Sequence, residues 1–426
     1  MKGVKFFLKK IKDCIRNNPK LVFILIASFL LRMIFIPIES NDFIVFLDEW
    51  TQYLKDNGNL MAIGSIYGNT NCNYYIPYLI IASLVSYLPV SNIFIIKIIS
   101  IIFDYLLAFA IYKIIFHFTN SKIKSELGLF FTLIFPYFII NSSAWGQCDS
   151  IYSFFIVLSI YMMACKKNYS MGVLSWTVAM SFKLQAIFFA PVILVLFLSG
   201  RIKIKHLLPS VAYGAGLLLF SFVVYRGDVM YPIQMSFLSQ LSNTDGWLSY
   251  MAPNIYRVLD LTDITFLNVL PNSYEDIEII IRASMIAFSV ATLVICVYLA
   301  YRVDDRYELD SKRIILMSAF FTMFAPFGLP NMHERYYYVT LVVMILAVII
   351  YFDDIRYLLG FSFIQLIAII NVNWASLAIG YEYQYVFGPI GIGIDYILSL
   401  TMVVFFYLYV KKLAYHFSKT LDKPII

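Results

Sequence analysis

Charged residues are scarce in this chain, since they make up 14% of its 426 residues against roughly 25% in ordinary soluble domains. Hydrophobic residues make up 61%, and the mean hydropathy is +0.79. This composition excludes a water-soluble globular protein. The chain also lacks strands of alternating polarity, because runs such as 93–112 are apolar on every face. That pattern excludes an outer-membrane β-barrel.

Paired cysteines and acidic metal motifs are missing as well. The five cysteines form no CxxC pair and no repeating spacing, so neither a zinc site nor a disulfide framework is indicated. No DxD sequence is present, and no cofactor or divalent metal is expected. The net charge is +6, but the basic residues collect in short loops, which is a signal of membrane topology rather than of nucleic-acid binding.

What remains is a series of long apolar runs, each close to the roughly 20 residues that a helix needs to cross a bilayer. The sequence therefore predicts an all-α polytopic membrane protein with about 12–13 transmembrane segments. The candidates lie at about 21–38, 77–90, 93–116, 127–141, 150–165, 170–182, 186–199, 207–224, 280–300, 314–329, 336–351, 357–372 and 389–410.

The positions of Lys and Arg predict the orientation. All but eight of the 32 lie in the termini or in loops that can share one side of the membrane, so both termini are expected in the cytoplasm of a cell-membrane protein. Thirteen crossings would put the termini on opposite sides. We expect 77–90 to be re-entrant, because fourteen residues reach only about 21 Å as a helix. If that segment spans, another early segment must be broken.

The organisation that follows alternates membrane modules with loops on the outer face. In the first outer loop, Phe43, Phe46, Leu47 and Trp50 recur at helical spacing, which predicts an amphipathic helix lying on the membrane surface. The predicted regions are a basic cytoplasmic N-terminus (1–20), an N-terminal catalytic membrane module (21–225) with outer loop 39–76, a long outer loop (226–279), C-terminal membrane helices (280–410) with outer turn 330–335, and a basic cytoplasmic tail (411–426).

Some charges fall inside apolar segments, where a charged side chain costs about 2.5–3.5 kcal/mol on insertion scales. Among the charges in these segments, Arg32, Asp104 and Lys183 are the ones singled out by this cost. Such residues usually face a cavity or a partner. For Arg32 and Lys183 the alternative is snorkelling to the interface, and for Asp104 it is a structural hydrogen bond between helices.

Several short polar motifs follow one another at the predicted outer ends of the segments. They are Asp42 after the first helix, Asn73-Tyr74 with Pro77-Tyr78-Leu79, NSSAWGQCDS at 141–150, Lys183 with Gln185, Ala252-Pro253-Asn254, and MHERY at 332–336. In this order they resemble bacterial multi-spanning glycosyltransferases of the GT-C superfamily, of the mannosyltransferase-like kind. The chain departs from that pattern at Tyr75-Ile76 and at Leu184. These departures bear on the choice of substrate more than on the type of reaction.

The resemblance implies a GT-C-like fold and the transfer of a sugar, a hexose such as mannose or glucose, from a polyprenyl-phosphate donor at the outer leaflet. The acceptor would be a cell-surface glycan, a glycolipid or a protein. Transfer through an oxocarbenium-like transition state needs a carboxylate that takes up the acceptor's proton, and Asp42 is the candidate. Cations would stabilise the departing phosphate. The candidate residues for that role are Arg335, His333, Lys183 and Arg32.

The remaining polar residues of the motifs are expected to bind sugar or acceptor groups. They are Asn73, Tyr74, Trp145, Gln147, Asp149, Gln185, Asn254 and Glu334. Trp145 could instead be an interfacial belt residue, and Glu334 could instead form a salt bridge with Arg335 or Lys183. Two other functions stay open. One is an outer-face glycan polymerase or ligase that uses diphosphate-linked oligosaccharides, and the other is a lipid-linked sugar transporter or flippase, for which internal repeats are lacking.

Overall fold

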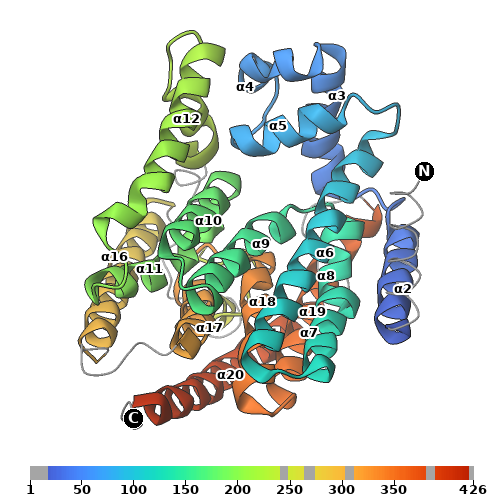
Figure 1. Ribbon diagram of the computed structural model, residues 1–426. Helices are drawn as coiled ribbons and strands as arrows, with labels where there is room; N and C mark the ends of the chain where they lie inside the picture. The colour runs from blue at the N-terminus through green and yellow to red at the C-terminus, as the bar shows by residue number, and fades with distance from the viewer. Residues whose placement is uncertain (1–17, 240–247, 263–273, 303–310, 380–388, 422–426) are drawn as a thin grey trace, which may run out of the picture.

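The structure is a computed structural model that describes residues 18–239, 248–262, 274–302, 311–379 and 389–421. These residues form helices joined by turns, and no strand occurs among them (Figure 1). Several of the helices are apolar and long enough to cross a bilayer. The all-α, multi-pass membrane class predicted from the sequence is therefore confirmed.

Five spans in the described ranges have the length and composition of a full crossing. They are α6 (Asn92–Thr119), η6 with α12 (Ile204–Leu207 and Leu208–Val224), α16 (Tyr274–Arg302), η9 with α18 and η10 (Glu334–Tyr337, Tyr338–Ala347 and Val348–Phe352), and α20 (Pro389–Leu421). A sixth results if α7 (Lys122–Ile134) and the helix after Pro136, bent by 47°, form one span. The total of twelve or thirteen crossings stays a prediction.

The remaining helices complete the bundle and its loops. They are α2 (Pro19–Phe35), η1 (Phe43–Leu47), α3 (Asp48–Asp56), η2 (Asn59–Gly64), α4 (Ile66–Asn69), α5 (Ile76–Val85), α8 (Pro136–Ile139), η3 (Ile140–Trp145), α9 (Asp149–Ile160), η4 (Tyr161–Cys165), α10 (Tyr169–Phe182), η5 (Leu184–Phe189), α11 (Ala190–Leu198), α13 (Tyr231–Ile233), η7 (Gln234–Leu238), α15 (Ile255–Thr262), α17 (Ser311–Gly328) and α19 (Arg356–Ile379). Helix α5 has ten residues and reaches about 15 Å, half of a bilayer core, and the re-entrant character of 77–90 stays a prediction.

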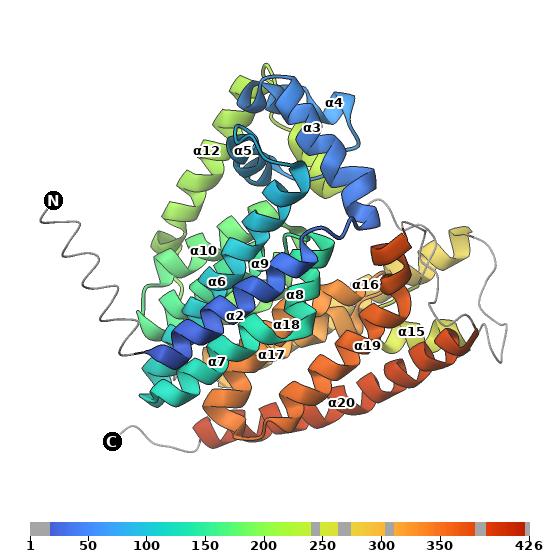
Figure 2. The same ribbon diagram turned by 90° about the vertical axis from the view of Figure 1, so that its right-hand side faces the viewer.

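Helix α18 forms the centre of the bundle. Every residue from Tyr338 to Ala347 is buried, and the helix packs against α17, α9, α7 and α19 (Figures 1 and 2). By contrast, only 6% of the apolar window of α12 and 11% of that of α16 is buried inside the protein. A helix that is apolar all round and so little covered by protein is suited to contact with lipid.

The helices η1, α3, η2, α4 and α5 form a cap at one end of the bundle, beside the end of α12 (Figure 1). The Tyr225 hydroxyl, just after α12, donates to the carbonyl oxygen of Ile63 at 2.8 Å, and its ring stacks on that of Tyr67. Helix α2 begins and α20 ends at the opposite end of the molecule (Figure 2). The side of the membrane on which each terminus lies stays a prediction.

The helix predicted in the first outer loop is present, as η1 followed by α3. Its apolar face consists of Phe43, Leu47, Trp50 and Leu54, which are all at most 5% exposed. This face packs against η2, α5 and α6. The expected contact with the membrane surface is therefore not what buries this stripe, because the periodicity of a sequence identifies an apolar face without identifying what covers it.

Candidate functional site

Asp42 lies where the chain leaves α2, and three side chains from distant parts of the sequence converge on one of its oxygens. Its Oδ2 accepts hydrogen bonds from Trp145 Nε1 at 2.9 Å, from Gln147 Nε2 at 2.6 Å and from Arg335 at 3.1 Å. Within the described part of the chain no group donates to Oδ1. The Asp42 side chain is 20% exposed, so the cluster holds the carboxylate firmly by one oxygen.

A single turn aims both Trp145 and Gln147 at Asp42. Gly146 separates them with φ of +79°, a conformation that a residue with a Cβ adopts at a cost. The backbone N–H of Gln147 then returns to the carbonyl of Asn141 at 3.0 Å. Helix η3 therefore ends in a reversal that presents two donors on one side.

Hydrogen bonds hold the segment that carries Asp42 against this turn and against α6. The Ser40 hydroxyl donates to the carbonyl of Trp145 at 2.9 Å. Lys97, a fully buried residue of α6, donates to the carbonyl of Ile36 at 2.9 Å and also to that of Ile38. These carbonyls follow the last turn of α2 and would otherwise lack helical partners. Ser40 and Lys97 belong to none of the sequence motifs, although a lysine within an apolar run is itself a signal.

Behind Asp42 lies a buried ion pair between Lys183 and Asp149. Lys183 Nζ is 2.6 Å from one carboxylate oxygen of Asp149, and Asn141 Nδ2 is 2.9 Å from the other. The Lys183 and Asp149 side chains are 9% and 0% exposed. Lys183 therefore does not snorkel to an interface. It lies at the break between α10 and η5, where the extended backbone directs it inward.

Arg335 connects the two halves of the site. Besides its bond to Asp42, its guanidinium lies 5.2 Å from the centre of the Trp145 ring, a distance typical of a cation–π contact. The Trp145 side chain is 3% exposed. The ring face expected to stack on a sugar is thus covered by Arg335, and Trp145 acts in this structure as a support for the cation.

The loop around Ala252-Pro253-Asn254 holds the segment that carries Arg335. The Ala252 N–H donates to the carbonyl of Met332 at 3.1 Å, and the Tyr337 hydroxyl donates to that of Pro253 at 3.1 Å. Asn254 Nδ2 donates to the carbonyls of Pro326 and Leu329. Asn254, expected to bind sugar or acceptor, is fully buried and fixes the end of α17.

His333 was expected to supply positive charge. It stacks on Tyr250, with ring centroids 4.8 Å apart, and burial together with the charges of Arg335 and Lys183 holds the pKa of His333 well below its ordinary value. A neutral imidazole is available for hydrogen bonding but not as a cation. Neighbouring Glu334 is fully buried, and its carbonyl accepts a bond from Tyr137 at 3.2 Å.

Arg32, the fourth expected phosphate ligand, belongs to a different cluster. Its guanidinium donates to Asp104 at 3.0 and 3.1 Å and to the carbonyl of Leu133 at 2.6 Å. Ser142 and Tyr338 also donate to Asp104, at 2.6 and 2.8 Å. Arg32 and Asp104 are both fully buried. The structure therefore does not bring Arg32 to Asp42, and the interhelical role left open for Asp104 is the one that is found.

The remaining predicted residues lie at the margins of the site. Tyr74 packs edge-on against Trp50, with ring centroids 5.2 Å apart, and its side chain contacts Cys148. Asn73 is half-buried in the same loop. Gln185 is 8% exposed, and its Oε1 has no hydrogen-bond partner among the described residues. Gln185 is thus one of the site residues with a buried acceptor left for a ligand, as is Asn141 through its Oδ1.

An apolar groove of about 560 Å³ opens beside Gln185. We call it the α16 groove, since α16 forms one wall and η5, α11 and α17 form the others. Its lining includes Gln185, Phe188, Leu194, Phe324 and Met332. Its polar lining residues are Gln185, Ser289 and Thr292, and the other lining side chains are apolar. This combination suits a ligand with a polar head and a hydrocarbon chain.

No group of three His, Cys, Asp or Glu side chains that could hold a metal ion occurs in the described ranges. No protein-family model matches the chain, and neither does any curated protein sequence. The arguments for function therefore depend on the geometry of this chain itself.

Proposed function

We propose that the chain is an integral-membrane glycosyltransferase that moves a hexose from a polyprenyl-phosphate donor to a cell-surface glycan or lipid-linked acceptor at the outer face. The observation that carries the proposal is the state of Asp42. Three donors hold Oδ2, and Oδ1 receives none from the described residues. A carboxylate oriented in this way can take up a proton at Oδ1.

In the proposed step, an acceptor hydroxyl oxygen forms a bond to the anomeric carbon of the sugar while the bond from that carbon to the phosphate oxygen breaks. The hydroxyl proton passes to Asp42 Oδ1, and polyprenyl phosphate leaves with the bonding electrons. Negative charge therefore grows on the phosphate as the bond breaks. Arg335, which is bonded to Asp42, and Lys183, which is paired with Asp149, are the cations that would stabilise that charge.

Roles for the other residues follow from their positions. The α16 groove would hold the polyprenyl chain of the donor, and Gln185 at its polar end would bind a phosphate or sugar oxygen. Gln147, which is bonded to Asp42, would contact the sugar or the acceptor together with Asn73 and Tyr74. Asp149 keeps Lys183 in place, while Trp145 supports Arg335. Transfer is expected without a metal or other cofactor, and the site would face the outside of the cell membrane.

The substitution Asp42→Asn tests this mechanism, because it keeps the shape of the side chain and removes its ability to take up a proton. Turnover of a polyprenyl-phosphate hexose by the purified protein in lipid nanodiscs should fall about 10²–10⁴-fold. Asp56→Asn is the matched control, since Asp56 lies on the exposed face of α3 and should leave turnover unchanged. Retained activity in Asp42→Asn would remove Asp42 as the base.

The nature of the donor separates the proposal from its competitors. Monophosphate-linked hexoses should be consumed, whereas diphosphate-linked oligosaccharides should not. Turnover of the diphosphate substrates alone would identify a polymerase or ligase. Movement of labelled lipid-linked sugar across a proteoliposome membrane without any transfer would identify a transporter.

A further inference from the structure

Arg257 of α15 is a buried cation that the proposed step does not use. Its Nε and Nη2 each lie 2.7 Å from Oδ2 of Asp395 in α20. Its Nη1 lies 2.7 Å from Oδ2 of Asp260 in the same helix. Arg257 and Asp395 are 3% and 1% exposed. One arginine thus holds two carboxylates and joins two helices.

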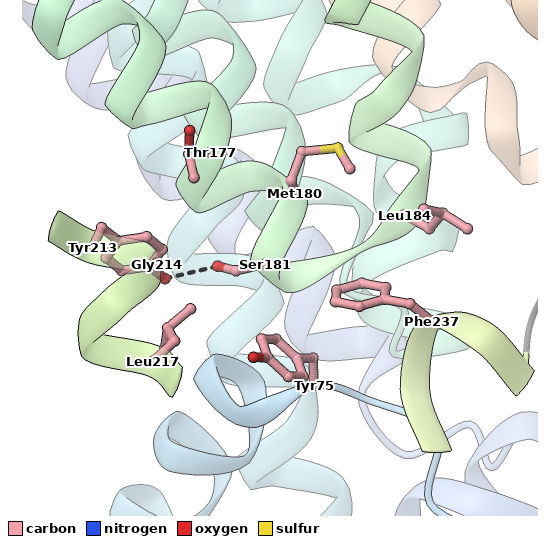
Figure 3. Close-up of a pocket in the computed structure, with 9 residues that line it drawn as sticks. All are labelled: Tyr75, Thr177, Met180, Ser181, Leu184, Tyr213, Gly214, Leu217 and Phe237. Atoms are coloured by element: carbon pink, nitrogen blue, oxygen red, sulfur yellow. Dashed lines mark hydrogen bonds between the residues drawn. The ribbon is translucent and has the colours of Figure 1, made fainter. Parts of the chain in front are cut away.

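This ionic link differs from neutral contacts elsewhere in the bundle. Figure 3 shows one of those, a hydrogen bond of 2.7 Å between the hydroxyls of Ser181 in α10 and Tyr213 in α12, beside a pocket of about 330 Å³. A single hydroxyl contact leaves the angle between its helices loosely defined. The planar guanidinium of Arg257 binds its carboxylate through two N–H groups at once, which fixes direction as well as distance. It therefore sets the position of α15 against α20.

Arg257 also reaches back along the chain to Met251. Its Nη2 lies 3.0 Å from Met251 Sδ, and its backbone N–H donates to Asn254 Oδ1 at 2.9 Å, which caps the start of α15. Met251 has φ of +64°, a conformation that residues other than glycine adopt where neighbouring contacts enforce it. Arg257 thus supplies contacts at both ends of the segment 251–254.

The segment 248–254 holds the residues that precede Arg335. The Asn331 N–H donates to the carbonyl of Leu248 at 2.9 Å, beside the bond from the Ala252 N–H to the carbonyl of Met332. Asn331 is itself in the left-handed region, with φ of +57°. The pairing of these two segments lies directly before η9, the helix that carries Arg335. A change in one segment is therefore passed to the other.

We infer that Arg257 is a positioning residue for the proposed reaction. Together with Asp395 it fixes the segment 248–254. That segment in turn sets the place of Arg335 beside Asp42, to which Arg335 is bonded at 3.1 Å. The inference rests on the proposed function and adds a charged pair that belongs to none of the sequence motifs. A displacement of about 1 Å at a reacting group can cost about a hundredfold in rate.

The buried pair is best removed as a whole, because removing one partner alone leaves the other charge buried without its counter-ion. Arg257→Met combined with Asp395→Asn does this, and we call the combination the pair replacement. Arg257→Lys is a second variant that keeps the cation and loses the planar fork. One control is Lys124→Met with Asp353→Asn, which removes an ion pair of 2.7 Å between α7 and the turn after η10. The other is Tyr213→Phe, which releases α12 from α10.

The first readout does not depend on catalysis. The guanidinium of Arg335 lies 5.2 Å from the centre of the Trp145 ring, so fluorine NMR of the full chain labelled with fluorotryptophan reports the place of that cation. The Trp145 signal is the one lost in Trp145→Phe, and Arg335→Gln shows how it responds without the cation. The pair replacement should move the signal in the same direction, and neither control should move it. An unmoved signal would overturn the inference.

The second readout is hexose transfer, measured as a double-mutant cycle. The pair replacement should lower kcat about tenfold and leave the donor KM within about twofold, because the charge that Arg335 meets grows only in the transition state. Arg257→Lys should do the same less strongly. In an Arg335→Gln background the pair replacement should lower kcat no further, since its effect passes through Arg335. An equal loss in both backgrounds would show a general structural defect and overturn the inference.

The two readouts together separate the inference from the proposed function. If the Trp145 signal moves but the unmodified protein transfers hexose to no acceptor, the proposed function fails and the link from Arg257 to Arg335 holds. If hexose is transferred and the signal stays in place in the pair replacement, the proposed function stands and the inference fails.

Discussion

At the scale of single residues, the few charges inside this apolar chain separate into two kinds. Arg32 and Asp104 are fully buried and are joined to each other, to Ser142 and to Tyr338. Asp42 and Arg335 are bonded too, but their side chains remain 20% and 16% exposed. The first pair is shut off from any substrate, whereas the second can still be reached.

This difference predicts opposite results for two arginine substitutions. Arg32→Met leaves the Asp104 carboxylate buried without its cation, which should lower the free energy of unfolding by about 3–5 kcal/mol. Thermal unfolding in detergent measures the loss, and adding Asp104→Asn to Arg32→Met should recover part of it. The KM for the donor should stay unchanged in the folded fraction. A donor KM that rises with no loss of stability would restore Arg32 as a phosphate ligand.

At the scale of elements, the turn from η3 to α9 matters most, because it places Trp145 and Gln147 on Asp42. It depends on Gly146 with φ of +79°. A Cβ there would lie 3.5 Å from Ile96, which is ordinary contact. The demand for glycine therefore comes from the backbone and not from a lack of space.

Gly146→Ala should accordingly cost about 1–2 kcal/mol in stability and also reduce transfer, since a relaxed turn moves both donors away from Asp42. The control is Gly200→Ala in the turn after α11, where φ is +73° and a Cβ meets nothing within 4 Å. Both variants should show a similar fall in melting temperature, and only Gly146→Ala should lose turnover. Equal activity in the two variants would show that the turn does not position the site.

Several of these element-scale features could be predicted from the sequence and others could not. Apolar runs identify helices because lipid requires every backbone group to be paired within the helix. The sequence motifs contain Asp42, Trp145, Gln147 and Arg335, which the structure brings into contact. The pairing of Arg32 with Asp104 could not be derived, since a charge in an apolar run is equally compatible with snorkelling. The burial of Trp145 beneath Arg335 depends on packing between segments 190 positions apart. The hydrophobic periodicity of a sequence does not predict such long-range contacts.

At the scale of the whole molecule, the cap of η1 to α5 occupies one end and the start of α2 and the end of α20 the other (Figure 2). Together with the positive-inside rule, this predicts that the cap faces outward. In a cysteine-free background, Met61→Cys in the cap, where Met61 is 87% exposed, should react with a membrane-impermeant maleimide on intact cells. Lys203→Cys, in the exposed turn before η6, should react only after permeabilisation. The reverse pattern would invert the proposed topology.

The bare outer faces of α12 and α16 have a consequence for how such a protein would be measured. Substrates that reach the protein sideways through the bilayer diffuse in two dimensions. Their effective concentration is therefore their mole fraction among the lipids and not their concentration in the buffer. Adding inert phospholipid at constant protein should therefore slow the reaction by dilution in the plane. The composition of the surrounding membrane thus becomes a component of the kinetics.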